Sequence, residues 1–571
     1  MKFNSLGTRL LVLTFTLALV AAACGGDDES NNEAGSSTTA TTLPKEEVPE
    51  GGTVTYASDQ EPTGWNPLTG NDSLAALTFL GVLVYPATFD TSPDFRIVMN
   101  KDLLTSAEQT SDDPQTIEYK INPEATWNDG TKVTGKDFIY NWKMQNNKQD
   151  TELGEGDPED ENAAEGTVPD VASTTGYEDI ESVEGEADAV TVTFATPYAD
   201  WQGLFGPIMP AHVLKDIKGW NDGLDTTKIP KFSAGPFQFD KYEPEKSVTL
   251  VPNESFWGEK AKVDEIVVRF GLEAPALPQA FENTEIDLLA QLKDIPEIKS
   301  QVNFGLSFEH IDFNLLNPLL ADKAVRQAIA YGLDREALVA RTVKQFDERA
   351  EVLNNRLWLN NQEEYEDHGG EYAKADTAKA ESTLETAGYA KGGDGIYAKD
   401  GKKLSFRIST TGGNKLREDT EAVIQDQLKA VGIDIKIANV EGSDVFDKFF
   451  PESGDFKDAD YDIALFAWVG TPFTASSNVS LYVPGGGQNE TSYVNEEVGT
   501  LFKEAVTSTD RAEVVAKTNQ IDEVLWEDLP SIPLYQKPTL LPARDTVLNV
   551  VDNASTYGPL WNAATWGVKK Q

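Results

Sequence analysis

Short runs in which apolar and polar residues alternate recur along the chain and predict β-strands. One such run, GTVTY at 52–56, opens the patterned part of the sequence. The other runs lie at 116–121, 189–194, 236–239, 247–251, 265–270, 404–408 and 434–437. Apolar residues at every third or fourth position predict helices at 136–143, 322–331, 334–343, 376–387, 417–430, 497–506 and 511–526. Strands and helices mix throughout without a fixed-period repeat, so the pattern predicts an α/β fold.

Turn and capping residues mark several ends of these elements. Thr134 is a suitable N-cap for the helix that follows it, and Asp137 lies near the positive end of that helix. Gly388 follows a predicted helix at the position that favours a left-handed residue. A strand is expected to end in a tight turn at Gly130, and the segment 395–403 is expected to form a hairpin turn.

The first residues have the pattern of a bacterial export signal. Lys2 and Arg9 precede an apolar stretch at 10–23, which ends in small residues directly before Cys24, the only cysteine of the chain. This is the pattern of a secretory signal, and the apolar stretch is shorter than the roughly 20 residues that span a membrane. The cysteine resembles the lipidation site of bacterial lipoproteins. We therefore predict a signal peptide at 1–23 and an acyl anchor on Cys24; an ordinary signal peptide with an incidental cysteine is the alternative.

Two segments have the composition of disordered or exposed chain. Residues 25–50 lack aromatic residues and are rich in Ser, Thr, Gly and acids, so 24–51 is expected to be a flexible tether. Acidic residues also concentrate at 150–165, which is expected to be an exposed insertion. This segment lacks the Asp-x-Asp-x-Asp-Gly pattern of a calcium loop, and whether it binds cations is left open.

The charge balance narrows the range of partners. The chain has 95 acidic and 48 basic residues, which gives a net charge of −47. Such a surface repels nucleic-acid phosphates and anionic lipid headgroups, so nucleic acid is not an expected partner. A solvated acidic surface, a salty medium and a cationic ligand are all compatible with this charge. With one cysteine, the core must stabilise the exported protein without disulfides.

Common catalytic and metal-binding patterns do not occur in the sequence. His212, His310 and His368 are widely separated, and no H-E-x-x-H or G-x-S-x-G motif is present. Carboxylate pairs arise by chance among 95 acidic residues, so counting them neither supports nor excludes a glycosidase. We therefore predict a binding protein with no catalytic residues, no metal and no cofactor.

Several longer motifs follow one another along the chain. They read EPTGWNP at 61–67, YKINPEATWNDGTKVTGKDF at 119–138, AGPF at 234–237, LVPNESFWG at 250–258 and VRQAIAYGLDR at 325–335, with further matches at 379–395 and 532–535. Their order and spacing over nearly all of 52–570 resemble family 5 of the bacterial extracellular solute-binding proteins. Members of this family are the peptide and nickel receptors of ABC importers.

This resemblance implies a two-lobed, class II periplasmic-binding-protein-like fold with an additional third domain. Domain I would comprise 52–86, 209–307 and 540–571, domain II 87–208 with the acidic insertion, and domain III 308–539. The chain would cross between the lobes twice, and the lobes would close by a hinge over a ligand between domains I and III. The implied partners are a small solute or peptide and an ABC permease. The protein is expected to be a monomer, held on the outer face of the cell membrane by the lipid on Cys24.

The resemblance also places the ligand near Trp468. In oligopeptide-binding members a Trp-x-x-Asp segment sets an aspartate against the peptide ammonium group, whereas this chain has Thr471 at the aspartate position. A hydroxyl offers no charge to an ammonium, so a peptide-like ligand and another small polar solute both stay open. The segments 466–473 and 196–205 are similar to an actinobacterial lipoprotein branch. Some of its members are connected with envelope glycolipid pathways, so a regulatory lipoprotein without transport is the alternative function.

Aromatic and polar residues near this segment and in other loops complete the predicted ligand contacts. Tryptophan can stack on sugars, peptide side chains or flat rings, and an arginine can pair with a carboxylate or phosphate. The predicted contacts are Trp468, Val469, Gly470, Thr471, Phe473, Trp65, Asn71, Asp72, Ser73, Trp358, Asn414 and Arg417. Packing within a lobe is the alternative for each of them. A structural role is expected for Trp127, Trp257, Trp526 and Trp561.

Overall fold

A computed structural model of the chain describes most of the sequence that follows the predicted export signal. The described residues are 43–58, 61–70, 72, 75–146, 168–185, 187–270, 277–289, 298–440, 448–449, 459–484 and 488–569. The predicted signal peptide, Cys24 and the acidic insertion at 150–165 lie outside them, as do Asn71 and Ser73. Among the helices that are described, none has the length and apolar character needed to cross a membrane.

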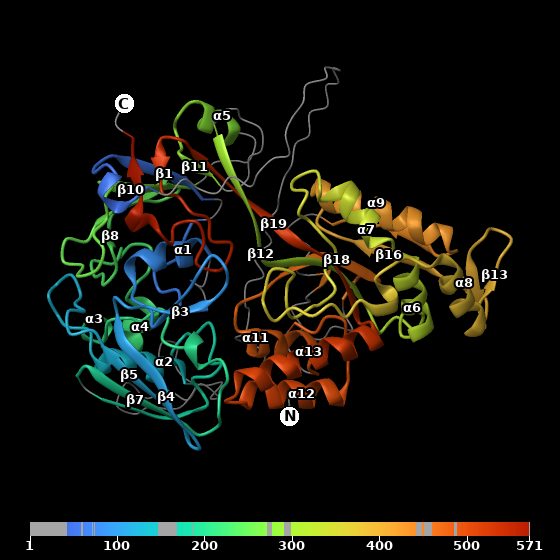
Figure 1. The fold of residues 1–571 in the computed structure, drawn as a ribbon, viewed down its shortest axis with the longest axis horizontal. Coiled ribbons are helices and arrows are strands. Elements are labelled where there is room, and N and C mark those ends of the chain that lie inside the picture. Colours follow the sequence, from blue (N-terminus) through green and yellow to red (C-terminus); the bar gives the residue numbers. More distant parts are fainter. Residues whose placement is uncertain are drawn as a thin grey trace.

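A ten-stranded sheet connects two lobes, in the order β17-β16-β18-β12-β19-β11-β1-β10-β9-β8. The strands of the first lobe are β1 (Thr53–Ala57), β8 (Phe237–Glu243), β9 (Ser247–Pro252), β10 (Glu265–Arg269) and β11 (Leu288–Leu289). Those of the second lobe are β16 (Ser405–Ser409), β17 (Asp434–Ile437) and β18 (Ile463–Val469). Two longer strands, β12 (Ile298–Phe313) and β19 (Ser531–Arg544), lie side by side and run from one lobe into the other (Figure 1).

The two long strands pair with each other once in each lobe. Residues 298–304 of β12 pair with 538–544 of β19 in the first lobe, and 308–312 pair with 531–536 in the second. Between these stretches the register shifts, so that 305–307 on β12 face a single residue of β19. At Gly305, an added Cβ would lie 2.7 Å from the carbonyl oxygen of Ala554, so only glycine fits. A bulged pair of strands therefore joins the lobes.

The additional domain is a four-stranded antiparallel sheet in the order β4-β5-β7-β6, with helix α2 (Gly135–Gln145) against it. Its strands are β4 (Leu104–Asp112), β5 (Gln115–Ile121), β6 (Ile180–Glu184) and β7 (Ala189–Phe194). Thr134 is the N-cap of α2 as predicted, and the Asp137 carboxylate accepts the Thr134 N–H at 2.9 Å. Trp127, Phe205 and Trp220 belong to a core that this domain shares with the first lobe.

The second lobe packs a layer of helices on each side of β18. The helices are α6 (Lys323–Gly332), α7 (Arg335–Thr342), α8 (Thr377–Thr386), α9 (Lys415–Ala430), α11 (Thr474–Tyr482), α12 (Glu496–Thr507) and α13 (Arg511–Asp528). Along β18, Ile463 and Leu465 belong to one apolar cluster, whereas Phe466 and Trp468 belong to another on the opposite face. Because both faces of the strand are buried, its sequence IALFAWV reads as a continuous apolar run.

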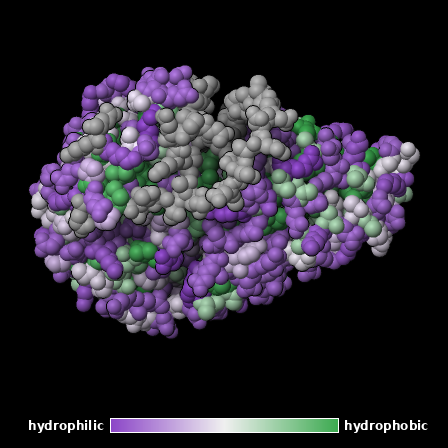
Figure 2. Space-filling model, turned by 45° about the horizontal axis from the view of Figure 1, so that its top comes forward, coloured by the Kyte–Doolittle hydropathy of each residue, from purple (hydrophilic) through white to green (hydrophobic). Residues whose placement is uncertain are grey.

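Shorter elements complete the described chain. They are α1 (Ala75–Val84), α3 (Ala211–Leu214), α4 (Ile217–Asp222), α5 (Leu277–Glu282), β2 (Phe89–Thr91), β3 (Ile97–Met99), β13 (Ala390–Lys391), β14 (Tyr397–Lys399), β15 (Lys402–Lys403), β20 (Val547–Leu548), β21 (Gly567–Val568), and the 3-10 turns Lys45–Glu47, Trp201–Gly203 (η2), Gly370–Tyr372 and Ala563–Thr565. The face of the molecule in Figure 2 is largely hydrophilic, with apolar residues in small separate patches.

Apart from the strand expected before Gly130, every strand and helix predicted from the sequence pattern overlaps an element of the same type. The hairpin at 395–403 is also present, as the turn between β14 and β15. One local prediction is wrong: the segment before Gly130 is not a regular strand. It makes only an isolated β-bridge between Thr126 and Lys132, because the chain turns back at once through Gly130, whose φ is +88°.

Candidate functional site

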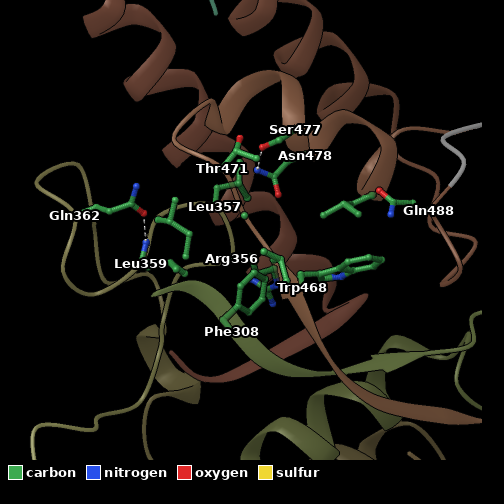
Figure 3. Close-up of a pocket in the computed structure, with 14 residues that line it drawn as sticks. Phe308, Arg356, Leu357, Leu359, Gln362, Trp468, Thr471, Ser477, Asn478 and Gln488 are labelled. Carbon is green, nitrogen blue, oxygen red and sulfur yellow. Dashed lines mark hydrogen bonds between the residues drawn. The ribbon is translucent and has the colours of Figure 1, made fainter. Parts of the chain in front are cut away.

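A pocket lies at the carboxyl end of β18, where the chain leaves the second lobe's sheet and enters helix α11. Its volume is about 50 Å³. The residues that line it come from four segments: Leu306 and Phe308, then Arg356, Leu357, Leu359 and Gln362, then Trp468, Val469, Gly470 and Thr471, and lastly Ser477, Asn478, Leu481 and Gln488 (Figure 3). Small-molecule sites usually have roughly 300–1,000 Å³, so this pocket is small for a ligand site.

Aromatic rings form the floor of this pocket. Trp468, which is 5% exposed, stacks on His310 with a centroid distance of 5.8 Å and an interplanar angle of 9°. Phe466 meets the same indole edge-on at 5.0 Å, and Phe308 lies 5.3 Å from the His310 ring. These contacts hold the indole in one orientation, so the pocket has a rigid aromatic surface on which a flat or apolar group can lie.

The chain turns sharply just after Trp468. The Gly470 N–H donates to the carbonyl oxygen of Leu306 at 2.7 Å, which ties the strand end to β12. The Thr471 hydroxyl oxygen accepts the N–H of Phe473 at 3.1 Å and so shapes the entry into α11. Position 471 therefore supplies a neutral hydroxyl to this part of the pocket.

Neutral polar groups surround the aromatic floor. In Figure 3, Thr471, Ser477 and Asn478 lie together across the pocket from the rings, with Gln362 and Gln488 at opposite sides. The Gln362 Oε1 accepts the Leu359 N–H at 2.8 Å, and the Asn478 Nδ2 donates to the Thr474 carbonyl at 2.8 Å. Hydroxyl and amide groups of this kind recognise hydrogen-bonding groups without requiring a ligand charge.

The charge of the one cationic residue in the lining is neutralised within the protein. Arg356 is 1% exposed and its guanidinium lies 3.0 Å from the carboxylate of Asp522, which is itself fully buried. The same guanidinium donates to the Ser531 carbonyl at 2.7 Å and lies over the Trp526 ring at 4.5 Å. Arg356 therefore fixes the wall of the pocket rather than presenting a free positive charge to it.

A second pocket, of about 270 Å³, lies beside the strands that join the lobes. Pro93 of the first lobe, Asn303, Phe304 and Gln536 of the joining strands, and Arg349, Glu351, Asn360 and Asn361 of the second lobe line it. Several of these side chains bond to one another or to the strands; the Gln536 amide, for example, donates to the Gly305 carbonyl at 2.8 Å. This crevice places polar groups of the second lobe and of the joining strands next to the register shift of β12.

The structure brings together part of the predicted contact set. Trp468, Val469, Gly470 and Thr471 line the first pocket, and Phe473 lies directly beyond them, with its ring against Gly203 of the additional domain. Asn71 and Ser73 lie outside the described residues.

The other predicted contacts have partners within the protein. Trp65 is fully buried between Phe239 and Tyr242, each with its ring centroid 5.0 Å away. Asp72 accepts the Asn66 N–H at 3.4 Å, and burial raises its pKa.

Two predicted loops of the second lobe are likewise tied into it. Trp358 is 1% exposed and its indole N–H donates to Thr518. Asn414 caps α9 by accepting the Arg417 N–H, and the Arg417 side chain is paired with Glu309 at 3.0 Å. None of these residues lines either pocket, and their contact with a ligand stays a prediction.

Several lining residues were not anticipated from the sequence. Leu306 and Phe308 belong to the run LSFEHIDF at 306–313, where the apolar pairs 306/308 and 311/313 are each spaced by two; this partial alternation is the signal that could have revealed a strand there. Ser477, Asn478 and Leu481 share one side of α11 at helical spacing, but this pattern alone does not distinguish a pocket wall from a core face.

Comparison with known proteins agrees with this architecture. The family described as "Bacterial extracellular solute-binding proteins, family 5 Middle" matches residues 99–490. The "Oligopeptide-binding protein OppA" of Mycobacterium tuberculosis is 28% identical over 517 residues, which cover 88% of this chain and 82% of that protein. The solved structure of a "Periplasmic EDTA-binding protein EppA" has a TM-score of 0.82 and 27% identity, and covers 95% of this chain and 100% of its own.

A further relative matches over a shorter region. The "Probable monoacyl phosphatidylinositol tetramannoside-binding protein LpqW" of Mycobacterium tuberculosis is 30% identical over 297 residues, which cover 48% of this chain and 43% of that protein. The chain therefore belongs to family 5 of the bacterial extracellular solute-binding proteins, the substrate-binding proteins of ABC importers. The predicted two-lobed fold with an additional domain is confirmed with it.

Proposed function

We propose that this protein captures a small polar or peptide-like solute between its lobes and delivers it to a membrane permease. The observation that carries the proposal is the pocket at Trp468, whose walls come from the joining strand β12, the strand β18 and helix α11. Its volume of about 50 Å³ fits a closed arrangement that must open to take up or release a ligand. These walls belong to the second lobe and the joining strand, and in the proposed mechanism the first lobe would close over them to complete the ligand site.

The chemistry of the pocket narrows the proposed ligand. Its floor is aromatic, its rim consists of neutral amides and hydroxyls, and its guanidinium is paired with Asp522. At Thr471 no carboxylate is available for a ligand ammonium group. We therefore favour a ligand held by stacking on Trp468 and by neutral hydrogen bonds, which includes the side chain or backbone of a peptide and the ring of a sugar.

We further propose that the protein works on the outer face of the cell membrane, held by a lipid on Cys24. The export pattern before this cysteine supports that location. A single acyl chain binds a membrane only marginally, whereas the several chains of a bacterial lipoprotein would anchor it durably. Mass measurement of the membrane-extracted protein would test this directly, since an unmodified N-terminus would contradict it.

A regulatory role in the cell envelope is the second candidate function. The specific observation in its favour is the 30% identity over 297 residues to a protein named for binding a mannosylated phosphatidylinositol. In this role the same two-lobed fold would bind its ligand without handing it to a permease. The two candidates differ in whether the bound protein stimulates transport.

Native mass spectrometry of the freshly purified protein tests ligand capture. We expect a co-purified small molecule that is lost on partial unfolding. Thermal-shift measurements with trialanine and with mannobiose then compare a peptide with a glycan, and a stabilising shift with one of them identifies the class. Retention of no molecule, together with no shift for any member of a broader peptide and glycan set, would contradict solute capture.

Replacement of Trp468 tests the placement of the site. Calorimetry with the solute identified above should show at least about tenfold weaker binding by Trp468→Ala, because the aromatic floor is lost. Trp127→Ala is the control, since Trp127 is a fully buried tryptophan with an expected structural role that does not line the pocket. Equal losses in the two variants would mean that Trp468 acts only through the packing of the protein.

A further inference from the structure

The additional domain contacts the second lobe at the start of helix α11. The Asp200 carboxylate, which precedes the 3-10 turn η2, accepts the backbone N–H of Ser476 at 3.0 Å. Ser476 is the third residue of α11, and Asp200 is only 5% exposed. The first N–H groups of a helix have no partner within the helix, so a carboxylate at this position acts as an N-terminal cap.

Helix α11 differs from its neighbours in where this cap comes from. The helices α6, α7, α8, α9, α12 and α13 of the second lobe are each capped by the side chain of their own N-cap residue, Asp322, Asp334, Asp376, Asn414, Asn495 and Asp510. The N-cap residue of α11 is Phe473, whose side chain makes no capping bond. Among the described helices of this lobe listed above, α11 alone receives its side-chain cap from another domain.

Further contacts join the same two parts of the molecule around this cap. The Ala199 N–H donates to the carbonyl oxygen of Val506 at 2.7 Å. Ala199 also packs against the apolar cluster of Ala475, Ala505 and Val514, which lie on α11, α12 and α13. On the other side of Asp200, the ring of Phe473 fills the space in front of Gly203. A continuous seam from Ala199 to Gly203 therefore docks on the helices of the second lobe.

The seam is also firmly attached to the domain that supplies it. The Tyr198 N–H donates to the Gln115 side chain at 2.7 Å, and the Gln115 amide donates back to the Tyr198 carbonyl at 3.1 Å. Gln115 is fully buried at the start of β5. A movement of the sheet β4-β5-β7-β6 would therefore carry Asp200 with it.

We propose that Asp200 is a positioning residue for the ligand pocket, through which docking of the additional domain orders the pocket wall formed by α11. Ser477, Asn478 and Leu481 of this helix line the pocket, directly after the residue that Asp200 caps. When the lobes separate, α11 loses its cap and its first turn loosens; when they close, the cap forms again. The additional domain thereby contributes to the site without touching the ligand.

The energetics of Asp200 are suited to a contact that forms and breaks. Burial raises the pKa of this carboxyl and outweighs the Ser476 hydrogen bonds and the attraction of Arg511, which act in the opposite direction. Desolvation therefore opposes docking, and the cap and Arg511 offset it.

Hydrogen exchange of the full chain without added ligand tests this inference. We expect the backbone amides of α11 to exchange about 2- to 30-fold faster in Asp200→Ala than in the wild type, because loss of a cap has an effect of this size. Asp510→Ala is the matched control, since Asp510 caps α13 of the same lobe from within that lobe. In this control the backbone amides of α13 should exchange faster, whereas those of α11 should exchange near the wild-type rate.

The conservative variant separates capping from general support of the fold. In Asp200→Asn an amide oxygen can still accept the Ser476 N–H, so the exchange of α11 should stay within about twofold of the wild type. Unchanged exchange in Asp200→Ala would overturn the proposal, as would an increase shared equally by α9, which Asp200 does not contact. The inference extends the proposed function, but this readout needs no solute, so failure of ligand capture and failure of the cap are distinguishable.

Discussion

The two lobes hold their buried charged groups in different ways. In the additional domain on the side of the first lobe, Asp137 is 3% exposed and its carboxylate accepts backbone N–H groups of Thr134 and Ala211, each at 2.9 Å. In the second lobe, the buried Glu309 faces Arg417 at 3.0 Å and Lys537 at 3.4 Å. The first arrangement is a local cap, whereas the second is an ionic network between β12, α9 and β19.

A second network of the same kind borders the pocket. Asp522 pairs with Arg356 at 3.0 Å and with His368 at 2.9 Å, and all three groups are largely removed from water. Ionic hydrogen bonds are directional, so these networks fix the segments that line the pocket in defined positions. The second lobe, which supplies the pocket, therefore depends on paired buried charges. Removing one partner of such a pair should lower the free energy of unfolding more than removing a buried charge elsewhere.

The largest expected effect is the loss of one partner from the Glu309 network. Arg417→Met should lower the free energy of unfolding by about 3–5 kcal/mol, because it leaves Glu309 buried with Lys537 alone. Urea denaturation measures this change. The control Lys415→Ala removes an exposed ion pair with Asp419 on helix α9 and should lower the free energy of unfolding by less than about 1 kcal/mol. Similar losses of unfolding free energy in the two variants would show that the buried network stabilises the fold no more than an ordinary surface ion pair does.

A smaller effect is expected where the second lobe buries a carboxyl without an ionic partner in contact. Burial raises the pKa of Glu421 to about 8, although an Asn439 hydrogen bond opposes the shift. A carboxyl with a raised folded-state pKa stabilises the fold below its unfolded value near 4.5, and this stability is lost as the pH rises through about 8.

Glu421→Gln should therefore match the wild type near pH 5 and exceed it at pH 8, by on the order of 2 kcal/mol. Thermal unfolding of both proteins across this pH range gives the difference. Parallel pH profiles of the two proteins would show that Glu421 is ionised in the folded state, with an ordinary pKa.

The smallest expected effect belongs to the local cap in the additional domain. Asp137→Asn should lower the free energy of unfolding by about 1 kcal/mol, because an amide can accept only one of the two N–H groups while the buried charge is also removed. Urea denaturation compares it with Asp240→Asn, an exposed carboxylate of the first lobe that should have little effect. A loss as large as that of Arg417→Met would mean that both lobes depend equally on buried charge.

The sequence pattern predicted the elements that have one buried face. Strand β7 and helix α12, for example, show clear alternation or helical spacing because one side faces the core and the other faces solvent. Strand β18 gave no such signal, since both of its faces are buried.

Strand β19 was hidden for another reason: it contains Pro533, Pro538 and Pro542, and proline usually argues against a central strand. Here Pro533 and Pro538 pair next to the two register shifts of β12, where the ladder is already interrupted. A single sequence read by itself does not reveal that the partner strand is bulged at those positions.

The candidate site was predictable only in its central segment. Trp468 to Thr471 form one continuous stretch and could be recognised as such. Phe308, Gln362 and Asn478 reach the same pocket from distant parts of the chain, and only the fold brings them together. The cap that Asp200 supplies to α11 likewise has no sequence signal in either segment alone. A single aspartate before a short turn is common in exposed loops.

The joining strands also determine how the molecule can move. Residues 305–307 of β12 and the facing residue of β19 lie outside the paired stretches of the ladder, so we expect the torsion angles to change there when the lobes move. Two neighbouring strands that cross between the lobes favour hinge rotation over sliding of one lobe past the other. The lobes are thus expected to travel along one arc, with Gly305 close against Ala554 at the pivot. A partner that binds the closed form then has to distinguish only one variable, the angle between the lobes.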